Sequence, residues 1–543
     1  MLRTEATADP GNVDRQPAAA DGVHGRSRSG RRAAAVALLV VLAVAAGLRF
    51  QALDFGRGVI DARPDEMGVA LALDGIQQGR PFPMFFAYGG GYHAPLYAFV
   101  RIWGALLWPD DLATMVRRDP WSVFVASRAW SALLSTLTVL VTYLVGRSVG
   151  GVTTGLLAAA MIASSPLAIR EAHFAKADAA AAFVAALSFL LLVRRPRSMT
   201  VCALTTGAVA GLAMSTKYLV AFAAMPLVAL GGDLGWRLRD GRWRPAALAV
   251  AVAVIVFLTL APAWLHDPGL SFGFFRSVAA SQQDYPRLPF FAGWVERPST
   301  YHVTVSLRYG AGLLVALLAL PALLRGLWRP GASRLIAIAV VAHGLVLLTN
   351  PLVVARNLLP SLSGIVVLVA DLVCTAVLRS PFSRRRAVAA CLVGLVLIAE
   401  PLSAGVRLVS LLGEPDTRAS AGRWIAEHVP PDARVITWGA PAGAADFGAP
   451  ALHGRAAPRA LPVERWSGAG VAYVVRHSYP LPFSSAPEPA DWPEMRAVAV
   501  FDPFDGPIDD PVLEPLDAFY LPLARFDGIT RPGPRITIYE VRR

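Results

Sequence analysis

Hydrophobic residues fill most of the chain in long runs, and short polar segments separate these runs. A run of about 18 or more apolar residues is long enough to cross the hydrocarbon core of a membrane as a helix. By this criterion about eleven segments are candidate membrane helices, near residues 33–50, 122–146, 151–168, 178–193, 200–215, 218–234, 246–264, 303–324, 335–350, 357–378 and 387–410. The pattern therefore predicts a polytopic α-helical membrane protein.

Both ends of the chain depart from this pattern. Residues 1–32 are rich in proline, alanine, glycine and arginine, a composition that is typical of a disordered segment. From about Glu414 onward prolines and charges become frequent; WIAEHV has helical spacing, whereas ARVITW, VAYVVRH and RITIYEV alternate as strands do. We therefore expect a membrane domain over residues 33–410 and a small α/β domain over residues 411–543.

Arginines are concentrated in alternate loops between the apolar segments. Cytoplasmic loops of membrane proteins carry an excess of basic residues. We therefore place the N-terminus, with its basic segment 1–32, in the cytoplasm. The cytoplasmic loops then contain Arg147, Arg194, Arg195, Arg197, Arg237, Arg239, Arg242, Arg244, Arg325, Arg329, Arg334, Arg379, Arg384, Arg385 and Arg386. An odd number of spans then puts the loop 51–120 and the domain 411–543 outside the cytoplasm. We expect a multi-pass protein of the cell inner or plasma membrane.

Composition supports the same class, because 55% of residues are hydrophobic, 16% are charged and the mean hydropathy is +0.49. In a soluble chain the net charge of +13 would suggest nucleic-acid binding. Here the basic residues separate apolar segments, and no basic face interleaved with aromatic residues is found, so no nucleic-acid partner is expected. All three cysteines lie in apolar runs, which supports neither a disulfide framework nor a cysteine metal site.

Three outward segments contain polar groups that apolar packing does not explain. They are the start of the loop 51–120 with its later sequence YGGGYHAPLY, the segment SSPLAIREAHFAKAD, and STKY. Their candidate side chains are Arg63, Asp65, Glu66, His93, His173, Lys176, Asp178 and Lys217. Only two of the 51 basic residues are lysines, Lys176 and Lys217, so both positions are candidates for a compact ammonium group.

Each of these segments also has a purely structural interpretation. Asp65 and Glu66 suit the N-terminus of a helix, where carboxylates cap exposed amides. The charges near residues 170–176 fit a solvated loop, and Lys217 fits a side chain that extends from a helix end to lipid headgroups. The sequence pattern alone leaves these alternatives open.

Taken in order, the motifs resemble the GT-C polyprenyl-phosphate-sugar glycosyltransferases, in the branch of the protein O-mannosyltransferases and the lipid A aminoarabinose transferase. The acidic pair follows the first span, HAPLY matches the family pattern x-P-P-L-Y, and ARNLLPSL resembles R-Y-x-L-P. Arg128 in ASRAW, Asp178 before the fourth span and the lysine of GLAMSTKY also match. His93 and Ala94 replace a lysine and a proline of some relatives, and Asn357 replaces the family tyrosine.

The resemblance implies a GT-C-like fold and the transfer of a sugar, a hexose or a pentose, from a polyprenyl-phosphate carrier to an extracytoplasmic acceptor, with inversion at the anomeric carbon. The acceptor would be a cell-envelope glycan, a lipid or a protein, and membrane lipids are further partners. Such a transfer needs a base for the acceptor hydroxyl, a cationic site for the leaving phosphate, and exclusion of water.

The resemblance also assigns roles to residues. Asp65 is the expected base, Glu66 orients the acceptor or a neighbouring cation, and Asp178 shapes the acceptor site or holds a phosphate-binding lysine. The donor phosphate is expected at Lys217, with contributions from Arg356, His93 and Arg63, and the other site candidates are His173, Lys176 and Arg128. Because side-chain cations can neutralise a monophosphate leaving group, no divalent cation is strictly required, and no metal-ligand spacing supports one.

Two other functions fit a polytopic chain. A transporter would place its charges near the bilayer midplane, on broken helices related by an internal repeat. A noncatalytic protein that binds surface glycans would keep the fold without the chemistry.

Overall fold

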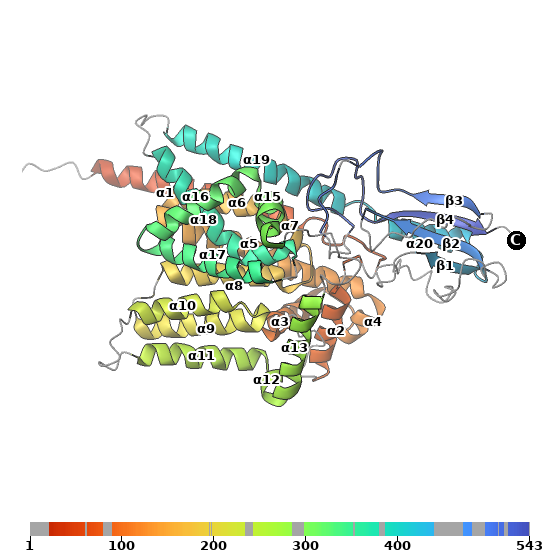
Figure 1. Ribbon diagram of the computed structural model, residues 1–543, viewed down its shortest axis with the longest axis horizontal. Helices are drawn as coiled ribbons and strands as arrows, with labels where there is room; N and C mark the ends of the chain where they lie inside the picture. The colour runs from red at the N-terminus through yellow and green to blue at the C-terminus, as the bar shows by residue number, and fades with distance from the viewer. Residues whose placement is uncertain are drawn as a thin grey trace, which may run out of the picture.

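The computed structural model of the protein describes residues 21–59, 62–63, 65–79, 89–194, 196, 198–233, 243–284, 298–350, 353–378, 386–438, 471–480, 495–508, 510–514 and 520–541. A body of helices occupies most of the molecule, and a small sheet with one helix lies at one end of it (Figure 1). This arrangement confirms the predicted helical body and C-terminal sheet. Predictions for residues 1–20 lie outside the described residues.

The helical body consists of helices from the whole membrane region, most of them long and a few of only one or two turns. Its elements are α1 (Asp21–Phe50), α5 (Pro120–Gly150), α6 (Val152–Ser164), α7 (Pro166–Ala172), α8 (Ala177–Val193), α9 (Met199–Lys217), α10 (Val220–Asp233), α11 (Arg244–Leu260), η3 (His302–Leu307), α15 (Arg308–Ala311), α16 (Leu313–Trp328), α17 (Ala332–Thr349), η4 (Ala355–Leu358), α18 (Leu359–Leu378) and α19 (Arg386–Leu412). Each of the apolar segments predicted above overlaps a helix of this body. Helix α1 begins at Asp21, earlier than the predicted end of the disordered N-terminus.

Six helices in the described part of the chain are long and apolar enough to cross a membrane, or eight if each of two bent pairs counts as one span. The remaining predicted spans correspond to the shorter apolar helices α8, α10 and α11. One bent pair is α6 with α7, whose axes are bent by 59° relative to one another. The bend follows from local chemistry: Ser165 caps α7 by accepting a hydrogen bond from Ala168 N, and Pro166 suits the first turn of the new helix.

Further helices lie at the end of the body nearer the sheet (Figure 1): α2 (Glu66–Gln77), α3 (Gly90–Leu107), α4 (Leu112–Arg118), α12 (Ala263–His266) and α13 (Pro268–Asp284). Helix α14 (Pro298–Tyr301) directly precedes η3 in the chain. Helices α2 and α3 bury Leu73, Leu96 and Val100 in one core with Phe124 of α5. This core fixes the start of α2, where the acidic pair lies, against the membrane body.

The C-terminal region forms helix α20 (Thr417–His428) and strands β1 (Arg434–Trp438), β2 (Val471–Ser478), β3 (Met495–Phe501) and β4 (Arg535–Val541). The strand order is β1-β2-β4-β3, with β1 parallel to β2 and the other pairs antiparallel. Ile425 of α20 packs on Val475 and Ile538. The sequence pattern indicated α20, β1, β2 and β4 but missed β3, an edge strand whose side chains are only partly covered.

The C-terminal region also packs back on the helical body. Leu521, Phe526 and Ile529 share a hydrophobic core with Phe55 of the loop after α1 and with Phe174 of the loop after α7. Because these two loops frame the start of α2, the C-terminal region lies over the end of the bundle that carries the candidate site.

Candidate active site

The acidic pair begins at Asp65, the residue before α2. Its Oδ2 lies 2.7 Å from Lys176 Nζ, and about a third (35%) of the Asp65 side chain is exposed, whereas Lys176 is buried. Asp65 occupies the N-cap position with a left-handed backbone (φ 78°), but its side chain makes no capping hydrogen bond in α2. The capping interpretation is therefore wrong for Asp65, whose carboxylate forms an ion pair with Lys176 instead.

Glu66, unlike Asp65, is buried in the protein. Both of its oxygens accept from Arg128, at 3.0 Å from Nε and 2.5 Å from Nη2, and Oε1 also accepts from Ala175 N at 2.8 Å. Arg128 in turn lies over the Phe55 ring at 3.8 Å and donates to the carbonyls of the loop after α1. Glu66 thus ties α2 to the residue that precedes Lys176, and this contact places Lys176 beside Asp65.

A second ion-pair group lies where α8 begins and α9 ends. Asp178 Oδ1 lies 2.5 Å from Lys217 Nζ, and Asp178 Oδ2 lies 3.7 Å from Arg356 Nε. Asp178 is buried, but the Lys217 and Arg356 side chains are 23% and 17% exposed. Lys217 is therefore held by a carboxylate rather than extended freely, and two cations of this group face accessible space.

The two groups act on one another electrostatically. Burial alone would raise the pKa of Asp65, but Lys176, Arg63 and Arg356 outweigh it and hold that pKa below the ordinary value. Burial, followed by the positive charges of Arg63 and Arg356, lowers the pKa of Lys176 to about 7, although Asp65 opposes this shift. The result is an ionised Asp65 beside a lysine that titrates near neutrality.

The glycines of YGGGYHAPLY bring α3 close to α9. Gly89 N donates to Thr216 O at 3.1 Å, and a Cβ added at Gly89 would lie 1.9 Å from Ser215 O. Only glycine allows this backbone approach, which seats the start of α3 on the turn that carries Lys217. His93, in the first turn of α3, is buried beside Tyr92.

Arg63 and His173 are buried too. The Arg63 guanidinium lies 4.1 Å from the Phe174 ring centroid. His173 Nδ1 and Nε2 face the carbonyl oxygens of Ile169 and Gln51 at 2.8 and 2.9 Å, and burial lowers the pKa of His173 to about 4. The charges near residues 170–176 are therefore not a solvated loop. His173 links α7 to the loop after α1, a structural contact rather than an exposed reactive group.

Sequence reasoning missed Glu514, which comes from the C-terminal region. It is buried, its Oε2 lies 2.7 Å from Arg170 Nη1, and its Oε1 accepts from Ala355 N at 2.6 Å. Burial would raise the pKa of Glu514, but Arg170 and Arg356 outweigh it and lower that pKa. No sequence signal joins Glu514 to Arg170, because the two residues are 344 positions apart.

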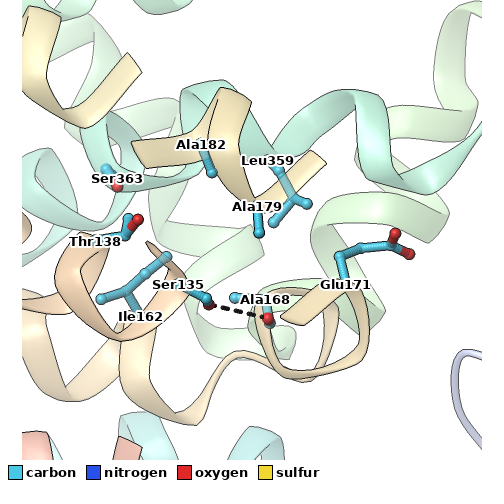
Figure 2. A pocket seen from close by; sticks show the side chains of 9 residues that line it. All are labelled: Ser135, Thr138, Ile162, Ala168, Glu171, Ala179, Ala182, Leu359 and Ser363. Atoms are coloured by element: carbon cyan, nitrogen blue, oxygen red, sulfur yellow. Dashed lines mark hydrogen bonds between the residues drawn. The ribbon is translucent and has the colours of Figure 1, made fainter. Parts of the chain in front are cut away.

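A small cavity of about 10 Å³ is lined by Ser135, Thr138, Glu171 and Ser363 among others (Figure 2). Ser135 Oγ donates a hydrogen bond to Ala168 O, and both residues line the cavity. This volume holds about one water molecule and no sugar. Among the described residues no three His, Cys, Asp or Glu side chains are arranged to hold a metal ion.

Part of the site lies in a region that matches a known family model. Residues 102–267 match the model described as dolichyl-phosphate-mannose-protein mannosyltransferase. The match confirms the resemblance over this part of the chain. It includes Arg128, His173, Lys176, Asp178 and Lys217, whereas Asp65 and Arg356 lie outside it. No curated protein matches the chain.

Among the solved structures that match the chain is ArnT from Cupriavidus metallidurans. In the apo state it has a TM-score of 0.49 at 19% identity and covers 82% of this chain and 93% of its own. Bound to undecaprenyl phosphate, the same protein gives a TM-score of 0.46 at 17% identity, with 80% and 92% covered. The apo oligosaccharyltransferase of Archaeoglobus fulgidus has a TM-score of 0.48 at 14% identity, and the match covers 81% of this chain and 69% of that one.

Proposed function

We propose that this protein is an integral membrane, inverting glycosyltransferase that moves a sugar from a polyprenyl-phosphate carrier to an extracytoplasmic glycan, lipid or protein. The observation that carries the proposal is the pairing of two aspartates with the only two lysines of the chain. Asp65 with Lys176 supplies a partly exposed carboxylate, and Asp178 with Lys217 supplies partly exposed cations. The family match over residues 102–267 supports the same chemistry.

Asp65 acts as the base in this proposal. Its carboxylate accepts the proton of the acceptor hydroxyl while the hydroxyl oxygen attacks the anomeric carbon from the face opposite the phosphate. The bond between the anomeric carbon and the phosphate oxygen breaks, and its electron pair stays on the phosphate. Lys176 keeps Asp65 ionised before the reaction, and the partial exposure of Asp65 leaves room for the acceptor.

Lys217 and Arg356 bind the phosphate. The leaving polyprenyl phosphate gains negative charge as the sugar departs, and cations already fixed in place stabilise this charge most strongly. Asp178 holds Lys217 at 2.5 Å and lies 3.7 Å from Arg356, so both cations are oriented before the donor arrives. The role of Glu66 in this proposal is to position Arg128 and the Lys176 loop, since its own oxygens are buried.

The proposal includes the topology inferred from the arginines. Residues 33–410 form the membrane domain with the N-terminus in the cytoplasm, and the region 411–543 is extracytoplasmic. The end of the bundle with α2, α3 and the sheet then faces outward (Figure 1). The transferred sugar is a hexose or a pentose.

The decisive experiment replaces the base. Purified Asp65→Asn protein is compared with wild type for release of polyprenyl monophosphate from polyprenyl-phosphate-linked mannose, then from a panel of other hexoses and pentoses. We expect kcat to fall by about 10²- to 10⁴-fold, while the binding of undecaprenyl phosphate is kept.

Asp74→Asn is the matched control, because Asp74 lies on the same helix and its carboxylate contacts Gln78 rather than the site. It should transfer sugar at the wild-type rate. More than a tenth of the wild-type rate in Asp65→Asn would reject the assignment of the base. A wild-type protein that transfers no member of the panel, with its native lipids and membrane extract as acceptor, would reject the function.

A further inference from the structure

Glu514 joins two segments of the membrane domain that carry site residues. Ala355, whose amide donates to Glu514 Oε1, is the first residue of η4, and the next residue of that turn is Arg356. Arg170, which pairs with Glu514 Oε2, lies near the end of α7, just before the loop that leads to Lys176. One carboxylate from the C-terminal region thus links the backbone of η4 to the end of α7.

The contacts of Glu514 hold the groups that it binds in fixed positions. The side chains of Glu514 and Arg170 are 1% and 2% exposed, so water does not compete for their ion pair. A buried carboxylate that accepts hydrogen bonds from both a guanidinium and a backbone amide has a narrow range of allowed positions. The amide of Ala355 is therefore held in place, and with it the start of the turn that carries Arg356.

The C-terminal region does not depend on Glu514 alone for its attachment. Leu521, Phe526 and Ile529 are buried with residues of the membrane domain, and Arg407 Nη2 donates to Ile529 O at 2.8 Å. Removal of the Glu514 carboxylate should leave this region docked. The effect should fall on what the carboxylate touches, which is Ala355 and Arg170.

We propose that Glu514 is a positioning residue for the donor-phosphate site, acting through Ala355 N to set the place of Arg356 beside Asp178. This inference rests on the proposed function, in which Arg356 binds the phosphate. It assigns the C-terminal region a part in the binding of the donor, beyond covering the membrane domain.

Two double variants test the inference. In Glu514→Ala/Arg170→Met the contact to Ala355 N is lost, and Arg170 is not left buried without Glu514. Glu171, which also pairs with Arg170 at 3.4 Å, loses this partner in both variants, so that loss cancels in their comparison. In Glu514→Gln/Arg170→Gln a neutral amide pair keeps an acceptor for Ala355 N. We expect the first variant to bind undecaprenyl phosphate about tenfold more weakly, the typical effect of losing one hydrogen bond to a charged group, and the second to bind within about threefold of wild type.

Steady-state kinetics distinguish a loss of donor positioning from a general loss of structure. In Glu514→Ala/Arg170→Met the KM for the donor should rise about tenfold, while the KM for the acceptor stays unchanged. Asp510→Asn is the control: it lies in the same segment, is 85% exposed and pairs with Arg525 at the surface. It should behave as wild type.

The possible failures are distinguishable. If wild type binds undecaprenyl phosphate and the folded Glu514→Ala/Arg170→Met protein binds it equally well, Glu514 does not position the phosphate site. Equal losses for donor and acceptor would also reject the positioning role. If wild type neither binds undecaprenyl phosphate nor transfers sugar, the proposed function falls, and the inference falls with it.

Discussion

We predict that activity depends on pH through Lys176, because of the charges and the burial around this residue. The charged groups that act on it are Asp65, Arg63, Arg356 and Asp178, and burial together with the two arginines lowers its pKa to about 7. Below pH 7 the ammonium is intact and holds Asp65; above pH 7 it loses its proton. If transfer requires the ion pair, kcat/KM should fall about tenfold for each pH unit above about 7.

Arginine at the same position provides the matched comparison. The guanidinium pKa is so high that Lys176→Arg stays charged throughout the range from about pH 6 to pH 9. Its kcat/KM, whatever its absolute level, should therefore be independent of pH on the alkaline side. The donor is a phosphodiester with no ionisation near neutrality, so the substrate itself does not produce the expected decline.

The assay measures initial rates of polyprenyl phosphate release at low donor concentration, in buffers of constant ionic strength. A wild-type profile that stays flat to about pH 9 would show that the charge of Lys176 is not needed. A Lys176→Arg profile with the same alkaline midpoint as wild type would assign the titration to another group. Either result refutes the link between Lys176 and the state of Asp65.

Three further predictions concern the phosphate site, the buried ion pair and the topology. Lys217→Ala should weaken binding of undecaprenyl phosphate by about ten- to hundredfold while the acceptor KM stays constant; titration with each ligand checks this, and unchanged donor affinity would reject the role of Lys217. Glu66→Gln leaves Arg128 buried without its carboxylate and should lower the free energy of unfolding by about 3–5 kcal/mol. The double variant Glu66→Gln/Arg128→Met should recover most of this stability. Thermal denaturation measures both variants, and an equal loss of stability in the two would refute the argument. Pro480→Cys, in a background where the exposed Cys391 is serine, should react with an impermeant maleimide added to intact cells; protection there, with labelling only after lysis, would reverse the proposed orientation.

The membrane class and the positions of the helices could be predicted from the amino-acid sequence. Hydrophobic length alone decides whether a segment can cross a bilayer, because every backbone polar group there must be bonded within the segment. The same periodicity predicted α20 and three strands, but not β3, whose half-exposed side chains leave little pattern. The order of the motifs also singled out Asp65, Asp178 and Lys217.

Which of these residues are partners depends on how distant segments pack, and the sequence pattern does not predict it. The contacts of Asp65 with Lys176, of Glu66 with Arg128 and of Asp178 with Lys217 join segments that are far apart in the chain. Neighbouring carboxylates such as Asp65 and Glu66 look equivalent in sequence, yet one faces accessible space and the other is buried. The residue type fixes the sign of the charge that a side chain can carry. Its burial, its distance to other charges and therefore its pKa depend on which distant segments pack beside it.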